Sequence, residues 1–349
     1  MAKKVLFRNR SGVPLYVEVG KNNNLTGTAP QVFDNDFDGH AKLVLFDVYG
    51  MLTVQGEEKP IFYFRHTDLA KHRHRFGNIL TPGDGPLSVQ ESSLFTKMAN
   101  GDVPVSDYRL ISEAPTVYGF DSAEPRMEYR LKEDGLYIQE GDFFSMKAEP
   151  WPFTLYDHQS IYMNSSLISQ PSVFSGVLDG KPFVGLGSFD RYCMNQGAGT
   201  FSNVPMGYVA FCMSGIREDG RKEMLFASGS VNSDGKVLAF YHLDGEVPVV
   251  SDHFEVEADW YHLPYVDDGT CVFKDAIIRF CGKEIHFTGK WGTKGFLDKP
   301  RIEKHGQSQV AGTFYEGAVP YRHRVSNCWS ECMEAYDTKL REWGFDVVD

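Results

Sequence analysis

Eight Asp-Gly pairs are spread along the chain, and they constrain its fold more than any other feature of the sequence. They stand at residues 38–39, 84–85, 134–135, 179–180, 219–220, 234–235, 244–245 and 268–269. Asp-Gly suits the two-residue type I′ turn, because both central residues of that turn need a positive φ. The chain is therefore expected to fold as a series of antiparallel hairpins.

The segments beside these pairs have the composition of strands. Residues 127–132 alternate between apolar and polar side chains, and residues 173–178 lead into the pair at 179–180. Cys281-Gly282 separates two further strand-like segments in the same way. Helical periodicity is confined to residues 90–98 and 338–343, whereas a parallel α/β sheet needs regular crossover helices. The sequence therefore predicts an all-β fold, a sandwich or a barrel.

Composition limits the partners of this chain. It has 26 Phe, 17 Tyr and 5 Trp among 349 residues, and such rings fill the core of stacked sheets or line an apolar pocket. The net charge of −12 argues against a nucleic-acid partner, which needs a basic face. No apolar stretch approaches the ~18 residues of a membrane span. The N-terminal residues lack the pattern of a signal peptide, so we expect a cytoplasmic protein.

The six cysteines are expected to be free thiols, because no secretory signal accompanies them. None forms a Cys-x-x-Cys pair, and no His, Cys, Asp or Glu spacing specifies a metal. Residues 34–39 begin like a calcium loop, but Leu45 stands where the bidentate Glu belongs. We therefore expect neither a metal nor a cofactor.

Ordered segments at residues 161–167, 174–183, 187–191, 206–226, 313–319 and 332–336 carry a family resemblance. Through them the chain, from Tyr162 onward, resembles the carotenoid hydratase and AttH-like family, whose superfamily also includes lipocalin-like Diels–Alderases. The family follows its Asp-His/Arg segment with Trp-Gly, where this chain has Tyr192-Cys193, and Ala335 replaces a glycine of the closing strand.

The resemblance implies two lipocalin-like, calycin-type antiparallel β-barrel halves packed together. We divide them as an N-terminal domain at 1–185 and a C-terminal domain at 186–349. It also implies a cofactor-independent enzyme of secondary metabolism, with a pocket for a hydrophobic small molecule near the domain junction. That enzyme would be a lyase (hydratase) or an isomerase or cyclase, acting on a terpenoid or polyketide by hydration, dehydration, isomerisation or Diels–Alder-type cyclisation.

The expected catalytic residues are Asp190, Arg191 and Glu316. Phe189 and Tyr192 flank Asp190 and are expected to give it apolar surroundings, and a carboxyl group among aromatic side chains loses solvation, which raises its pKa and suits it to proton transfer. Arg191 or a Tyr hydroxyl group would polarise a carbonyl group in a cyclisation. The expected substrate-binding residues are Tyr162, Phe189, Tyr208 and Tyr315.

Two alternatives stay open at this point. Asp190 and Arg191 could form a buried ion pair between the halves, and Glu316 could pair with Arg322 or Arg324. The protein would then be a non-catalytic carrier of an apolar ligand, or a double barrel with a filled interior. An ionisable group with a perturbed pKa beside a pocket favours the enzyme.

Overall fold

The computed structural model describes most of the chain. The described ranges are 3–8, 17–21, 42–68, 73–76, 80–84, 89–91, 101–104, 109–113, 117–123, 126–132, 134–157, 165–194, 208–230, 237–262, 271–293, 308–316, 319–320, 323–332, 337–343 and 347–348.

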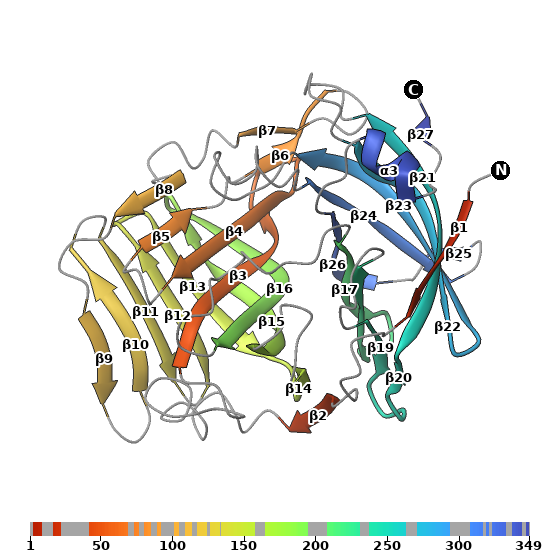
Figure 1. Cartoon of the computed structure of the whole chain (residues 1–349). Helices are drawn as coiled ribbons and strands as arrows, with labels where there is room; N and C mark the ends of the chain where they lie inside the picture. Colours follow the sequence, from red (N-terminus) through yellow and green to blue (C-terminus); the bar gives the residue numbers. More distant parts are fainter. Residues whose placement is uncertain are drawn as a thin grey trace.

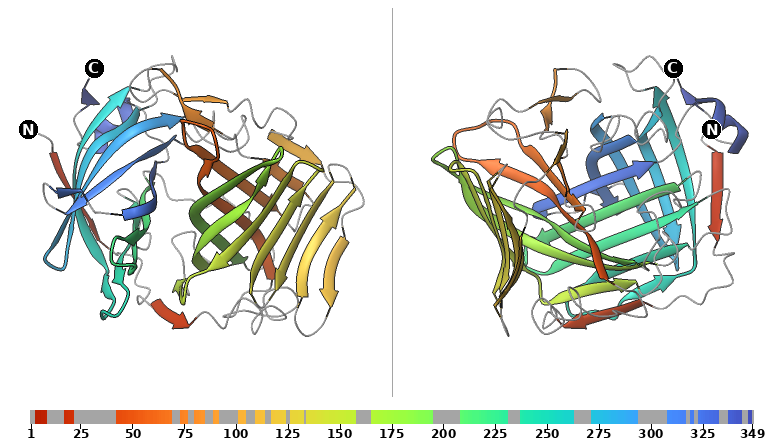
Figure 2. Two further views of the ribbon diagram at one scale, coloured as in Figure 1. Left: turned by 180° about the vertical axis from the view of Figure 1, so that it is seen from behind. Right: turned by 60° about the vertical axis from the view of Figure 1, so that its left-hand side comes forward.

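Two sheets make up nearly all of the described structure, and they stand side by side in Figures 1 and 2. The first sheet bends into a half-barrel, with β16 and β3 in the middle of its path. Its strands are β2 (Val17–Lys21), β3 (Lys42–Val54), β4 (Ile61–Asp68), β5 (Arg73–Phe76), β6 (Leu80–Pro82), β7 (Val89–Glu91), β8 (Gly101–Pro104), β9 (Arg109–Glu113), β10 (Val117–Ser122), β11 (Met127–Lys132), β12 (Gly135–Glu140), β13 (Phe144–Pro150), β14 (Phe153–Asp157), β15 (Ser165–Leu178) and β16 (Lys181–Met194).

The second sheet contains the later part of the chain. Its described strands pair antiparallel except β27, which lies parallel to β21. They are β1 (Lys3–Arg8), β17 (Tyr208–Arg217), β18 (Lys222–Ser230), β19 (Leu238–Leu243), β20 (Val249–Ser251), β21 (His253–His262), β22 (Cys271–Phe280), β23 (Lys283–Thr293), β24 (Ser308–Glu316), β25 (Val319–Pro320), β26 (His323–Cys332) and β27 (Val347–Val348). The predicted all-β fold of two antiparallel halves is confirmed.

Two of the described hairpin turns have the backbone geometry expected of a type I′ turn, whereas only the glycine has a positive φ at Asp134-Gly135, Asp219-Gly220 and Asp244-Gly245. Asp179 and Gly180 have φ values of 48° and 80°, and they join β15 to β16. Cys281 and Gly282, at 46° and 77°, join β22 to β23. Two consecutive positive φ values define the type I′ turn, so the turn chemistry sets the register of both hairpins. The Asp-Gly pairs at 38–39, 234–235 and 268–269 lie outside the described residues.

The change from one sheet to the other falls between β16 and β17. The expected domain boundary, between residues 185 and 186, lies inside β16, which continues in the first sheet to Met194. The chain also crosses over near its start, because β1 pairs with β21 in the second sheet. Sheet membership therefore divides the described chain after residue 194, with β1 added to the later part.

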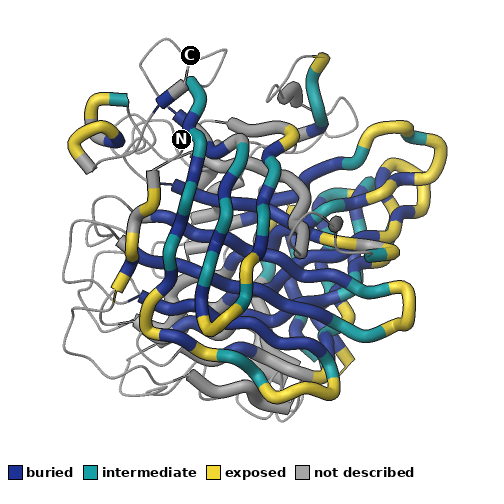
Figure 3. The backbone as a smooth tube through the Cα atoms, turned by 90° about the vertical axis from the view of Figure 1, so that its right-hand side faces the viewer, coloured by how far each residue is buried: buried dark blue, intermediate teal, exposed yellow. Residues whose placement is uncertain are grey.

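The second sheet encloses a large apolar core. Strands such as β21 alternate between buried and partly exposed residues, and Figure 3 shows this alternation along the tube, whereas all six residues of β19 are buried. The core includes Phe7 of β1, which stacks on Phe254 at 4.8 Å between ring centroids. Val209, Phe211 and other buried residues of β17 point into the same core.

Helical structure is sparse in the described residues. α3 (Asp337–Trp343) occupies the segment that was expected to be helical near the C-terminus. In the other expected segment, residues 89–91 form β7, and residues 92–98 lie outside the described part. In the part of the chain that the structure describes, no helix is long and apolar enough to cross a bilayer.

Candidate functional site

Asp190 in β16 is a buried carboxylic acid surrounded by hydroxyl groups. Its side chain is 4% exposed. The Tyr49 hydroxyl donates to Oδ2 at 2.9 Å, and the Ser169 and Ser188 hydroxyls donate to Oδ1 at 2.7 and 2.6 Å. The two serine oxygens are 3.1 Å apart. Three neutral donors therefore saturate most of the acceptor capacity of this carboxyl group.

Strand register explains why these four side chains meet. Ser188 lies two residues before Asp190, so the two side chains share one face of β16. Ser169 of β15 lies directly opposite Asp190, and Tyr49 of β3 lies opposite Ser188. Gly187 permits the close approach of β3, because a Cβ atom there would lie 2.1 Å from the Tyr49 carbonyl oxygen. The constellation is thus a product of three paired strands.

Burial raises the pKa of Asp190 to about 6, from an ordinary value of 3.8. Desolvation is the largest cause; the hydrogen bonds from Ser188, Ser169 and Tyr49 oppose it, and the nearby Asp47 adds to it. Among the described residues no cation is hydrogen-bonded to Asp190. Burial likewise raises the pKa of the Tyr49 hydroxyl well above 10, so this phenol stays neutral. A carboxyl group that titrates near pH 6 can both give and take a proton at neutral pH.

The hydroxyl partners of Asp190 line a small cavity between the two sheets. Its volume is about 10 Å³, which is close to the space one water molecule needs. The Tyr49 ring of the first sheet meets the Trp329 ring of the second sheet edge-on, with centroids 5.2 Å apart. Asp190 itself does not line the cavity; its hydrogen-bond partners Tyr49, Ser169 and Ser188 do. The lining residues are Tyr49, Ser169, Pro171, Ser188, Cys212, Met213, Ser214, Met224, Leu225, Phe226, Asn327 and Trp329.

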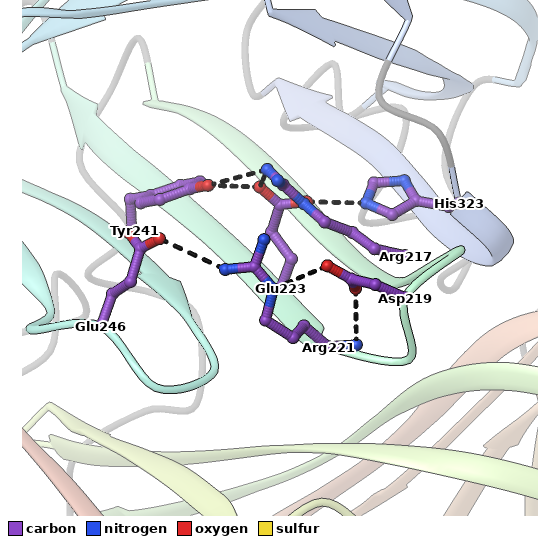
Figure 4. Close-up of polar contacts among 7 residues, drawn as sticks. All are labelled: Arg217, Asp219, Arg221, Glu223, Tyr241, Glu246 and His323. Carbon is purple, nitrogen blue, oxygen red and sulfur yellow. Dashed lines mark hydrogen bonds and ion pairs between the residues drawn. The ribbon is translucent and has the colours of Figure 1, made fainter.

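A second buried carboxylate, Glu223 of β18, has the opposite electrostatic character (Figure 4). Arg217 binds it with two hydrogen bonds of 2.6 and 2.8 Å, and His323 contacts it at 2.8 Å. The Tyr241 hydroxyl donates to the same carboxylate. Although burial opposes ionisation, these partners together lower the pKa of Glu223 to about 2. Glu223 is therefore held as a carboxylate, which suits a structural ion pair better than proton transfer.

A third buried carboxylate, Glu140 of β12, is also paired with a cation. Arg65 Nε lies 3.0 Å from Glu140 Oε1. The Tyr63 and Tyr129 hydroxyls donate to that same oxygen at 2.7 and 3.0 Å. The Tyr63 ring stacks on Phe144, so this pair is built into the interior of the first sheet. Of Asp190, Glu223 and Glu140, Asp190 is the one whose hydrogen-bond partners in the described structure are all neutral.

The structure places the predicted residues of β16 as follows. Asp190 faces the junction between the sheets. Phe189 is 1% exposed and, as the neighbouring residue of a strand, lies on the opposite face, so it does not line this cavity. Arg191 pairs through its backbone with Ile168 and Phe46, and its side chain is outside the described part.

The other predicted residues lie in the second sheet or outside the description. Glu316 and Tyr315 are at the end of β24, where the backbone is described and the side chains are not. Glu316 lies five residues after Ala311, which is the strand partner of Trp329. Five residues of a strand span roughly 17 Å, and this is the distance between Glu316 and Ala311 along β24. Tyr208 begins β17, again with an undescribed side chain, and Tyr162 lies outside the described residues.

Sequence reasoning missed the partners of Asp190. Tyr49 and Ser169 are far from it in the chain, and only the sheet register brings them together. Ser188 could have been found, because a residue two positions away on a strand shares its face. Among the residues within the described ranges, no group of three or more His, Cys, Asp or Glu side chains is arranged to hold a metal ion.

Fold and site together define an all-β protein of two antiparallel sheets with a buried acid at their junction. No protein-family model matches the chain, and no curated protein does.

The solved structures that are similar to it include the following three. Kievitone hydratase from Nectria haematococca has a TM-score of 0.47 and 10% identity, with coverage of 95% of this chain and 99% of that one. A putative AttH from Nitrosomonas europaea has a TM-score of 0.46 and 14% identity, with 84% and 93% covered. CghA with Sch210972 has a TM-score of 0.45 and 10% identity, with 92% and 98% covered. One of them bears the AttH name of the family that the sequence resembles. Identities this low do not transfer a reaction, a substrate or a catalytic residue to this chain.

Proposed function

We propose that this protein is a cofactor-independent acid–base enzyme in which Asp190 holds and returns the proton. The observation that carries the proposal is the buried Asp190 carboxyl group, with a pKa of about 6, behind the wall of a cavity between the sheets. Following the sequence resemblance, the substrate is an apolar terpenoid or polyketide. The reaction is a hydration, dehydration, isomerisation or cyclisation that needs a proton donor and acceptor.

The hydroxyl groups around Asp190 provide the path for the proton. Tyr49, Ser169 and Ser188 all line the cavity, whereas Asp190 does not. A protonated Asp190 donates to one of these oxygens, which in turn donates its own hydrogen into the cavity. The reverse shift returns a proton to the carboxylate. Positioned acids and bases of this kind contribute rate factors of about 10²–10⁴.

The cavity limits how the substrate is bound. Its volume of about 10 Å³ admits a small group and not the body of a terpenoid. The proposal therefore requires the two sheets to separate when substrate binds. The apolar side chains of the second sheet that line the cavity, such as Met224 and Phe226, would then cover the substrate.

A carrier of an apolar ligand is the second candidate. It is favoured by the predominantly apolar wall that the second sheet contributes, which includes Met213, Leu225 and Trp329. A carrier needs no titrating group, so its ligand affinity would not depend on Asp190. An enzyme needs that group for turnover.

The experiment compares the wild-type protein with Asp190→Asn. Each is incubated with prenylated phenols, linear terpenes and polyene polyketides in deuterium oxide and in heavy-oxygen water. Mass spectrometry then detects deuterium uptake, addition of one labelled water, or an isomer of unchanged mass. Asp142→Asn is the matched control, because that side chain is 88% exposed.

We expect turnover with the wild type and with Asp142→Asn, and a loss of roughly 10²–10⁴-fold with Asp190→Asn. Turnover that survives in Asp190→Asn overturns the mechanism. Ligand retention by both proteins, without any labelled product, supports the carrier instead.

A further inference from the structure

Two polar groups on the second sheet face the cavity without a hydrogen-bond partner in the described structure. They are Oδ1 of Asn327 and Nε1 of Trp329. Both residues belong to β26, both line the cavity, and they are 2% and 8% exposed. They are two residues apart on one strand, so they share a face. One group is an acceptor and the other is a donor.

Leaving such groups unpaired is costly. A buried polar atom without a partner costs about 1–3 kcal/mol, and native proteins usually satisfy such atoms with protein or ordered water. A buried water needs two to four polar partners and at least ~10–15 Å³ of space. The cavity volume of about 10 Å³ is at the lower end of this requirement. Its polar lining supplies an acceptor, a donor and the hydroxyl groups of four residues, Tyr49, Ser169, Ser188 and Ser214.

We propose that Asn327 and Trp329 form a binding site for one water molecule between the two sheets. The water donates one hydrogen to Asn327 Oδ1 and accepts a hydrogen from Trp329 Nε1. Its second hydrogen is left for the hydroxyl groups that lead to Asp190. This water site is inferred from the pair of unpaired polar groups and the cavity beside them. The site therefore does not depend on the proposed reaction.

The catalytic role of this water rests on the proposed function. In a hydration, Asp190 gives its proton through the hydroxyl groups to one alkene carbon, and the π electrons form the new C–H bond. The water oxygen then bonds to the other alkene carbon. One O–H bond of the water breaks, and its proton returns by the same route to the Asp190 carboxylate. The product gains the elements of one water, and the enzyme is restored.

The water site is tested by nuclear magnetic resonance on the full chain labelled with nitrogen-15. Loss of one indole signal in Trp329→Phe identifies Trp329 among the five tryptophans. A rotating-frame Overhauser experiment then detects water beside that indole proton, and the sign of the cross-peak separates proximity from hydrogen exchange. Asn327→Leu removes the acceptor. Ser330→Ala is the matched control, because Ser330 is also buried on β26 but faces away from the cavity.

We expect a water cross-peak at the Trp329 indole in the wild type and in Ser330→Ala, and its loss in Asn327→Leu. The indole signals of the other tryptophans should keep their positions, which shows that the variant is folded. Absence of the cross-peak in the folded wild type overturns the site, as does a cross-peak unchanged in Asn327→Leu.

A second measurement separates the site from its catalytic role. If the protein hydrates a substrate, Asn327→Leu should slow uptake of labelled oxygen by roughly 10²-fold, the effect of misplacing a reactant by about 1 Å. Deuterium uptake by isomerisation of the same substrate should change far less. Equal losses in both would overturn the catalytic role of the water. A cross-peak without any turnover would leave the site in place and count against the proposed function.

Discussion

Replacing Asp190 with Asn should make the stability of this protein less dependent on pH. Asn has nearly the same shape and keeps partners for the three surrounding hydroxyl groups, but it does not titrate. In the wild type, burial raises the pKa of Asp190 from 3.8 to about 6. The folded state therefore binds this proton more tightly than the unfolded state does. The resulting stabilisation is complete below pH 3.8 and is lost as the pH rises through 6.

The size of the effect follows from the two pKa values. A difference of about two units corresponds to ~3 kcal/mol over the whole titration. Between pH 5 and pH 8 the wild type should lose about 1.4 kcal/mol of unfolding free energy through this one group. The Asn variant has no such loss, so the stability difference between the two proteins should move by that amount in favour of the variant.

Urea unfolding at pH 5 and pH 8, followed by tryptophan fluorescence, measures this difference. At a slope near 3 kcal/mol per molar urea, the relative midpoints should move by roughly 0.5 M. Asp142→Asn should follow the wild type, because its exposed side chain is hydrated in both states. If the urea midpoints of the wild type and Asp190→Asn shift equally between the two pH values, the raised pKa of Asp190 is refuted. The acid–base argument built on that pKa is then refuted as well.

Three other substitutions test the remaining features. Glu223→Gln should lower stability by about 3 kcal/mol at pH 7, because it leaves Arg217 without its carboxylate; calorimetry would show a lower Tm, and an unchanged Tm would contradict the buried ion pair. Arg65→Met should cost about 3–5 kcal/mol by stranding the Glu140 carboxylate, and adding Glu140→Leu should recover most of that loss in urea unfolding. Gly187→Ala should cost at least ~1–3 kcal/mol, because its methyl group would overlap the backbone of β3, and a wild-type thermal midpoint would disprove that contact.

Much of the fold could be predicted because its determinants are local. Asp179-Gly180 and Cys281-Gly282 specify tight turns, and the alternating segments beside them specify strands. The order of the strands in each sheet could not be obtained in this way. β17 lies beside β26 because their faces match in three dimensions, and no local pattern in either segment records that choice. The domain boundary at 185/186 divided β16 for the same reason.

The site was predictable in part. Asp190 was identified from the segment that carries the family resemblance, with Phe189 and Tyr192 expected to supply apolar surroundings. In a strand, the residues directly before and after Asp190 point to the opposite face of the sheet, so they do not surround its carboxyl group. Ser169 and Tyr49 surround that group instead, through register with β15 and β3. Burial raises the pKa of Asp190, whereas the hydrogen bonds from the Ser169 and Tyr49 hydroxyl groups lower it.

The pairing of β1 with β21 has a consequence for how the polypeptide is made. During synthesis, Arg8 of β1 cannot pair with His253 of β21 until His253 has left the ribosome. At ~5–20 residues per second this delay is on the order of 10–50 s. During that time the segment containing Phe7 has no sheet to join, while the strands that follow it can already pair with one another. When several copies are synthesised close together, an unpaired β1 can add to the exposed β21 edge of a neighbouring copy. Strand-exchanged dimers are therefore the misassembly that this topology favours.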